Sequence, residues 1–362
     1  MNLHDIEKAH MFQVCPRRAL LEFGLLGTGI ERIALDVAKT SRRYIREGIQ
    51  CLLRGNMGHT GFGLEGIDTI LPAILKRYEQ EVTTRGLDVE QGEDPYFVFL
   101  EQSALIESTL RGYAIIEKPR LRPLYDYLGE YEGVPILEDK LSGEVYAYTV
   151  RVVAKDDNQT KIRDLHSLYT VAIGAMLVEK YGEDFKGTIL QYVFVGERRK
   201  GETVVRYQAT PFISGYKQNV GGRLAAKKDR KDARTGHMMR LGNDFKRFDA
   251  WRPGSPVALD RWIEFLYEHK ELEPLFKQVL VNPPQKDEGE LALCEVAATC
   301  WHVSEEIAAQ HPHPNIFGVF PMHRHACDIP VCPYQALSCC FGDVDFNDPM
   351  ATAVYRQKEV TE

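Results

Sequence analysis

Four cysteines within fourteen residues, close to the end of the chain, constrain this protein more than any other feature of its sequence. They are Cys327, Cys332, Cys339 and Cys340, and prolines accompany the first two. Thiolates are soft ligands that select zinc or iron–sulfur clusters, and such clusters are commonly held by four of them. Eight cysteines in a chain with no signal-peptide pattern also indicate a reducing compartment, where clustered cysteines bind metal more often than they form disulfides.

A further ligand can come from Cys15, which precedes Pro16 near the start of the chain. A site that joins it to the tail closes a loop of about 310 residues, so its binding energy becomes folding energy. Cys339 and Cys340 then compete for one position. Two alternatives stay open: the cysteines are buried without a metal, or zinc replaces the cluster and uses a histidine of the tail. The candidate histidines are His313, His323 and His325.

The composition is that of an ordinary globular protein. Of the 362 residues, 44% are hydrophobic and 27% are charged, which argues against a disordered or fibrous chain. No apolar run of about 18 residues occurs, so we expect no membrane span and a cytoplasmic protein. The net charge of -7 argues against a surface that is basic throughout, but it permits a local basic groove.

The apolar pattern divides the chain into four regions, which we expect to form one integrated domain. These are a mainly helical part at 1–120 with the first cysteine ligand, a sheet core at 121–222, a basic and helical part at 223–310, and a cysteine-rich tail at 311–362. Short segments rich in Val, Ile, Leu and Tyr predict strands in the core. We expect strands at 121–128, 134–141, 145–155, 188–195 and 204–214, and helices at 163–181 and 288–310.

Two segments carry a resemblance to a known family. Cys-Pro-Arg-Arg-Ala-Leu-Leu-Glu-Phe at 15–23, paired with the terminal Cys…Cys-Pro-Tyr…Cys, resembles the iron–sulfur nucleases of the PD-(D/E)XK superfamily. These include CRISPR-adaptation exonucleases, AddAB-type nuclease domains and phage exonuclease-like proteins, and the tail resembles the phage branch most. The resemblance implies an α/β fold with a mixed central sheet flanked by helices, and a structural [4Fe-4S] cluster. Its ligands would be Cys15, Cys327, Cys332 and Cys339.

An enzyme of this kind needs an acidic pair and a lysine on adjoining strands. The carboxylates hold Mg²⁺ or Mn²⁺, hard cations that prefer oxygen, and the metal activates water against the scissile phosphate. The resemblance assigns these roles to Asp126, Glu138 and Lys140, with Asp126 and Glu138 as metal ligands. A different alignment places 150–155 on the catalytic strand with Lys155 as the lysine. No carboxylate then lies two residues before the lysine, and the site is degenerate.

Two departures from the family pattern favour the degenerate alternative. Many members carry a histidine after a glycine in an early helix, where this chain has Cys51 after Gly48, and a glutamine on the helix after the lysine, where this chain has 163–167 without one. Glu47 or His166 could contribute instead. The resemblance implies a metal-dependent DNA nuclease that acts on single strands or from an end, in phage or mobile-element replication or recombination. The alternatives are an inactive relative that binds DNA or a replication or recombination partner, and a zinc-stabilised binding protein of other ancestry.

A basic strip follows the sheet core. Six cations lie in twelve residues with only two aspartates between them: Arg223, Lys227, Lys228, Arg230, Lys231 and Arg234. A run like this is either a solvated helix face or a strip that contacts DNA phosphates, which supply affinity independent of base sequence. The aromatic residues Phe245, Phe248 and Trp251 could stack on unpaired bases or pack in the core.

Overall fold

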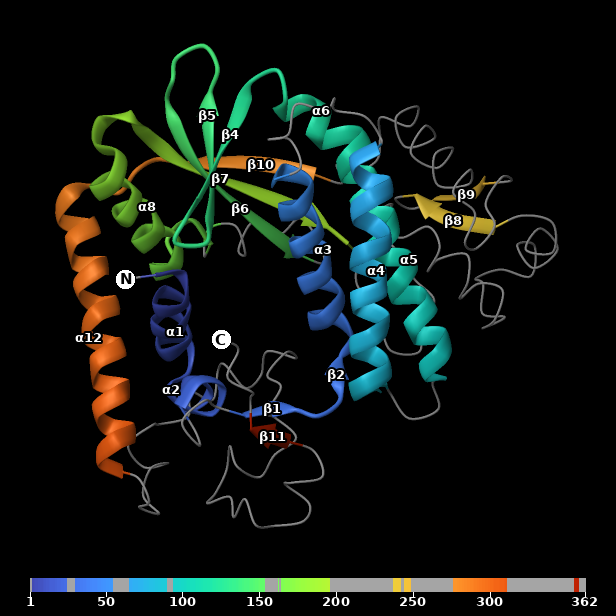
Figure 1. The fold of residues 1–362 in the computed structure, drawn as a ribbon, viewed down its shortest axis with the longest axis horizontal. Coiled ribbons are helices and arrows are strands. Elements are labelled where there is room, and N and C mark those ends of the chain that lie inside the picture. The colour runs from blue at the N-terminus through green and yellow to red at the C-terminus, as the bar shows by residue number, and fades with distance from the viewer. Residues whose placement is uncertain are drawn as a thin grey trace.

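A computed structural model describes residues 2–24, 30–54, 65–89, 94–153, 162, 164–195, 237–241, 244–248, 276–310 and 355–357. A five-stranded mixed sheet lies at its centre with helices around it (Figure 1). The helices are α1 (Leu3–Val14), α2 (Pro16–Ala19), the π-helix η1 (Leu20–Gly24), α3 (Val37–Arg54), α4 (Glu65–Arg85), α5 (Pro95–Gly112), the π-helix η3 (Tyr113–Glu117), α6 (Lys118–Leu121), α8 (Leu168–Tyr181), the 3₁₀-helix η4 (Gly182–Asp184) and α12 (Lys286–Gln310). The strands are β1 (Ile30–Arg32), β2 (Leu35–Asp36), β3 (Leu87–Asp88), β4 (Tyr125–Tyr131), β5 (Val134–Asp139), β6 (Val145–Val153), β7 (Phe185–Phe194), β8 (His237–Leu241), β9 (Asp244–Phe248), β10 (Phe276–Val281) and β11 (Tyr355–Gln357).

The central sheet has the strand order β10-β7-β6-β5-β4. Strands β4, β5 and β6 form an antiparallel meander, whereas β6 and β7 run parallel and α8 lies between them in the sequence. A parallel pair needs such a crossover, because the chain must return to the same end of the sheet. Strand β7 is almost entirely buried, since it has a neighbour on each side and helices over both faces.

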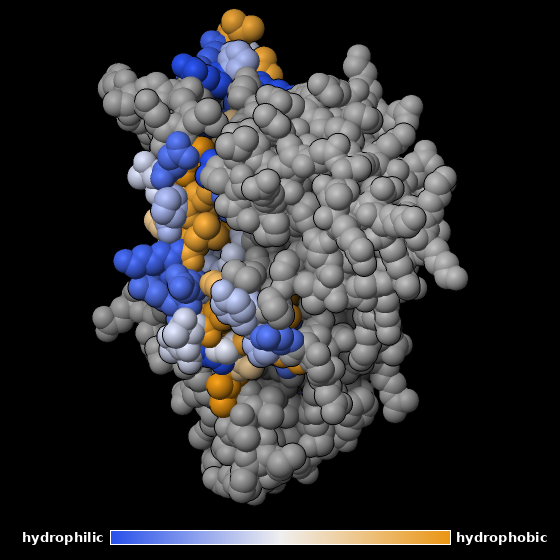
Figure 2. Space-filling model, turned by 90° about the vertical axis from the view of Figure 1, so that its right-hand side faces the viewer, coloured by the Kyte–Doolittle hydropathy of each residue, from blue (hydrophilic) through white to orange (hydrophobic). Residues whose placement is uncertain are grey.

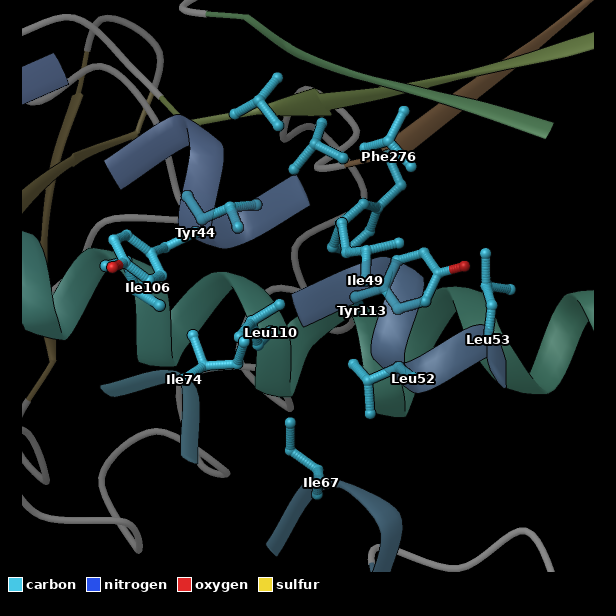
Figure 3. Packing of buried hydrophobic residues seen from close by; sticks show 14 of the residues in the cluster. Tyr44, Ile49, Leu52, Leu53, Ile67, Ile74, Ile106, Leu110, Tyr113 and Phe276 are labelled. Carbon is cyan, nitrogen blue, oxygen red and sulfur yellow. The ribbon is translucent and has the colours of Figure 1, made fainter. Parts of the chain in front are cut away.

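Each face of the sheet packs against its own group of helices. Tyr148, Val150 and Val152 of β6 belong to a core with α3, α4 and α5, and Figure 3 shows part of this packing around Leu110. Val145 and Ala147, at odd-numbered positions of the same strand, point to the opposite face and belong to a second core with α1, α8 and α12. This alternation follows from the period of two along a strand, and it fixes which helices lie on which side.

Local signals explain where several helices begin and end. The side chains of Asn2 and Asp5 form a capping box at the start of α1, and Ser167 caps α8 by accepting a hydrogen bond from the Thr170 amide. Helix α8 ends at Gly182, whose φ of 60° suits glycine better than any residue with a side chain. The helix expected at 163–181 therefore begins later than the apolar stripe indicates, after its cap.

A short antiparallel ladder brings distant parts of the chain together. Strand β11 pairs with β1, so that Arg356 lies opposite Glu31. Strand β1 in turn contacts η1. Helix α1, which precedes η1 in the chain, packs against α12 (Figure 1). The C-terminal strand thus lies beside the segment that follows Cys15.

The predicted mixed sheet with flanking helices is confirmed, but several boundaries differ. The strand expected at 121–128 begins at Tyr125, because α6 and a turn occupy the preceding residues. At 237–248, where we expected helix, β8 and β9 pair antiparallel; Gly-Asn between them is a two-residue hairpin signal. Viewed from the α4–α5 side, the described surface carries apolar side chains bordered by hydrophilic ones (Figure 2). No described helix has both the length and the apolar character needed to cross a bilayer.

Candidate functional site

The three residues predicted to be catalytic come together on the hairpin at the edge of the sheet. Asp126 of β4 lies directly opposite Glu138 of β5, and the Lys140 ammonium lies 3.1 Å from the Asp126 carboxylate. The Asp126 side chain is 63% exposed, so solvent screens this ion pair. The hairpin therefore holds two carboxylates and a lysine in the order that the sequence predicted, on an open surface.

The hairpin shows no preformed metal centre. Across the described ranges, no group of three or more His, Cys, Asp or Glu side chains is arranged to hold a metal ion. The neighbouring Asp139 has another role: it accepts hydrogen bonds from the backbone amides of Leu141 and Ser142, which lowers the pKa of its carboxyl group and shapes the turn to β6. The catalytic assignment of Asp126, Glu138 and Lys140 stays a prediction.

The predicted cluster ligands are described only in part. Cys15 is buried, with 4% of its surface exposed, at the break between α1 and α2, where its backbone carbonyl begins the short helix. The tail cysteines Cys327, Cys332, Cys339 and Cys340 lie outside the described residues, as do Lys155 and the basic strip at 223–234. What the structure adds is the β1–β11 ladder, which brings 355–357 to the part of the molecule that holds Cys15.

A cleft lined by both charged and apolar residues opens between the two groups of helices, on the side of the sheet where β5 begins. Its volume is about 470 Å³, and α1, α2, η1, α3, β5, β6 and Tyr169 of α8 line it. The β5–β6 ladder spans Ile136–Glu138 on β5, whereas β6 continues to Val153, past the start of β5. The staggered strand ends leave the space that α1 and α3 border.

Cations outnumber carboxylates in this arginine-rich cleft. The cations that line it are Arg18, Lys39, Arg43, Arg46 and Arg151, and the carboxylates are Glu7, Glu22 and Glu47. The residues come from five separate elements, so no local sequence pattern singles them out. Of these residues, the sequence analysis considered only Glu47, as a possible contributor to a catalytic site. His166, the other residue considered in that role, lines a separate cavity beside β10 and Pro284.

Two of the three carboxylates already form ion pairs with basic side chains. Glu22 pairs with Arg18 and with Lys39, at 3.4 Å in each case. Glu47 lies 3.1 Å from Arg77, and Arg43 bridges it to α4. These pairs neutralise Arg18, Lys39 and Arg43 among the cations of the cleft.

Arg46 and Arg151 are different, because no carboxylate of the described residues forms an ion pair with either. The Arg151 guanidinium lies over the Tyr169 ring, 4.6 Å from its centroid, and its Nε is buried without a hydrogen-bond partner among those residues. A buried donor without a partner is destabilising, so Arg151 carries a hydrogen-bonding group that the described residues leave unsatisfied.

The third carboxylate, Glu7, has an unusual electrostatic environment. Burial raises the pKa of Glu7, and this effect outweighs the opposing charges of Arg46, His4 and Arg151. Glu7 is therefore a weaker counter-charge for the two arginines than an exposed glutamate would be. As a result, the cleft has an excess of positive charge.

A buried hydrogen-bond network supports the cleft wall at Tyr148. The Tyr148 hydroxyl donates to Gln191 and lies 3.0 Å from the Tyr113 hydroxyl. Gln278 of β10 donates to Gln191 at 3.0 Å and to Glu117 at 2.6 Å. The network crosses three strands and connects them to η3, so this wall is held by polar contacts as well as by apolar packing.

Comparisons with known proteins give no match. No protein-family model, no curated protein and no solved structure is similar to this chain. The functional argument therefore depends on the residues of the cleft and the hairpin.

Proposed function

We propose that this protein binds the phosphate backbone of DNA in the arginine-rich cleft and does not hydrolyse it there. The observation that carries the proposal is the pair Arg46 and Arg151, two cations that face one cavity without a carboxylate partner among the described residues. Guanidinium groups match phosphate geometry and remain charged at any physiological pH. The proposal corresponds to the inactive, nuclease-like relative that the sequence offered as an alternative.

The charge balance of the cleft disfavours hydrolysis by a divalent metal. Mg²⁺ and Mn²⁺ need carboxylate oxygens. Glu22 and Glu47 already face cations, and burial favours the neutral form of Glu7. The cleft thus suits an anion better than a divalent cation.

Binding of a single-stranded oligonucleotide, followed by fluorescence anisotropy at several salt concentrations, tests the proposal. Arg46→Ala and Arg151→Ala should each weaken binding about tenfold and lower the salt slope by about one, because each removes a phosphate contact. Arg54→Ala is the matched control: Arg54 also lies on α3, but it pairs with Glu130 on the hairpin and does not line the cleft. Unchanged affinity in both cleft variants, or no binding by the wild type at low salt, would refute the proposal.

The convergence of Asp126, Glu138 and Lys140 on one hairpin favours a second candidate, a Mg²⁺- or Mn²⁺-dependent nuclease. In that case the two carboxylates would bind the metal and Lys140 would neutralise charge on the phosphate. Nuclease assays with each metal test this candidate. Cleavage that Lys140→Ala abolishes would establish it, and equal cleavage by Lys140→Ala would remove the hairpin from consideration.

The [4Fe-4S] cluster remains part of the proposal, with Cys15, Cys327, Cys332 and either Cys339 or Cys340 as ligands. The buried position of Cys15 at a helix break and the β1–β11 ladder support it. The cluster would supply covalent cross-links between the two ends of the chain. Anaerobically purified protein should be brown, and Cys15→Ser should be colourless with a lower melting temperature; colourless wild-type protein with stoichiometric zinc would favour the zinc alternative.

A further inference from the structure

Glu7 is the one carboxylate in the cleft for which the structure shows no ion pair among the described residues. It lies on α1, next to the fully buried Ile6, and faces the cleft together with Arg46 of α3 and Arg151 of β6. All three groups influence one another, because the charges of both arginines oppose the rise in the pKa of Glu7 that burial causes. Any anion held by the two arginines therefore experiences the charge state of Glu7.

An ionised Glu7 and a bound phosphate repel each other in a site that is partly shielded from water. A protonated Glu7 removes this repulsion, and its O–H can donate a hydrogen bond to a phosphate oxygen. Phosphate binding and protonation consequently favour each other, and the coupling is reciprocal. Burial has already reduced the free energy needed to protonate Glu7.

We propose that one phosphate group of the bound DNA strand lies between Arg46 and Arg151, and that Glu7 takes up one proton from solvent as this phosphate binds. This inference rests on the proposed function, because it requires the strand to enter the arginine-rich cleft. It adds that the affinity of the cleft for the strand depends on the protonation of Glu7. The strand therefore binds more tightly in mildly acidic solution than at neutral pH.

Other titratable groups face Glu7 and could produce a pH dependence of their own. His4 and His10 lie on the same helix, Glu22 lies on η1, and Tyr169 lies on α8. Burial raises the pKa of Tyr169, which keeps this hydroxyl neutral across the acidic range. The two histidines are the rivals that an experiment must separate from Glu7.

The affinity of the wild type for a single-stranded oligonucleotide, measured from pH 5 to pH 8 at constant ionic strength, tests the inference. Affinity should rise as the pH falls, because Glu7 is protonated to a greater extent in the bound state than in the free state. Glu7→Gln imitates the protonated form, so it should bind about tenfold more tightly than the wild type at pH 7, because the repulsion between the carboxylate and the phosphate is lost. Its affinity should be independent of pH in the carboxyl range. Glu7→Ala also removes the charge and should show the same flat profile.

Calorimetry in two buffers of different ionisation enthalpy measures the proton directly. With a tenfold coupling, the wild type should take up about half a proton near the midpoint of its profile, and Glu7→Gln should take up none. His4→Gln and His10→Gln should each retain the wild-type uptake. A profile in Glu7→Gln that matches the wild type, or a pH dependence that disappears in either histidine variant, would overturn the inference while leaving binding in the cleft intact. The proposed function fails separately, if Arg46→Ala and Arg151→Ala bind like the wild type.

Discussion

The edge hairpin and the arginine-rich cleft are two charged clusters on one sheet, and they differ in how far water reaches them. On the hairpin, Lys140 and Asp126 form an exposed pair, so each neutralises the other in solvent. In the cleft, the Arg151 Nε is buried without a hydrogen-bond partner among the described residues, and burial raises the pKa of Glu7. The cleft thus holds charges that are desolvated and have no ion pair among the described residues, whereas the hairpin charges pair in solvent, and the order of charges in the sequence does not reveal this difference.

The largest expected effect concerns the wall behind the cleft. Gln191 is fully buried, and its side-chain carbonyl accepts hydrogen bonds from Tyr148 and Gln278. Gln191→Leu removes the acceptor that both donors share and leaves Tyr148 with Tyr113 and Gln278 with Glu117, so we expect the free energy of unfolding to fall by about 2 kcal/mol for the two lost hydrogen bonds. Urea denaturation followed by circular dichroism measures the loss. A loss of less than about 1 kcal/mol would show that the network relaxes around the substitution, and that the cleft wall is no more rigid than the hairpin.

The same network predicts a pH effect at its far end. Burial raises the pKa of Glu117, although Arg120 and the hydrogen bond from Gln278 oppose the rise. Because the folded state binds the proton more tightly than the unfolded state, Glu117 favours folding below its unfolded pKa, and this contribution is lost as the pH rises through its folded pKa. Glu117→Gln should remove that loss and raise the free energy of unfolding at pH 7 by about 1 kcal/mol.

Urea denaturation of the wild type and Glu117→Gln from pH 4 to pH 8 measures this difference. The two proteins should be closest in stability at the acidic end and separate as the pH rises. A difference that is constant with pH would mean that Glu117 is neutral throughout. A matched substitution on the hairpin, Glu138→Gln, changes a partly exposed carboxylate and provides the control.

Much of the sheet was predictable because its signals are local. The alternation in 145–153 and the turn at Ser142-Gly143 lie within a few residues of the strands that they define. The meeting of Asp126, Glu138 and Lys140 was predictable for the same reason, since a hairpin joins neighbours in sequence. Strand β10 was not predicted, because its side chains are mostly exposed and the alternation is weak.

The cleft could not be predicted from the sequence, because its parts are distant. Glu7, Arg46 and Arg151 come from two helices and a strand, and only the packing of α1 and α3 on opposite faces of the sheet brings them to one opening. Local patterns also cannot reveal which arginines find partners. Arg43 and Arg46 lie three residues apart on α3, yet only Arg43 reaches Glu81 on α4.

A smaller effect is expected at the turn that connects the hairpin to the cleft. Glu132 and Gly133 join β4 to β5 with φ angles of 50° and 85°, and Gly133 also lines the cleft. Two positive φ angles are typical of a type I′ turn, in which Asn-Gly is favoured. Glu132→Asn should raise the free energy of unfolding by about 0.5 kcal/mol and leave oligonucleotide affinity unchanged. Loss of stability would indicate that the Glu132 side chain makes a contact that compensates for its backbone.

The smallest effect is expected on the hairpin itself. Lys140→Ala removes the ion pair with Asp126, but an exposed pair of this kind contributes little, because solvent screens the attraction and both side chains lose freedom when they pair. The free energy of unfolding should change by less than about 0.5 kcal/mol, and the coupling with Asp126→Ala in a double-mutant cycle should be of similar size and should shrink at 1 M salt. Coupling above about 1 kcal/mol would mean that the hairpin orders its charges as firmly as the cleft does. That result would weaken the contrast between the two regions and return attention to Asp126, Glu138 and Lys140 as a catalytic group.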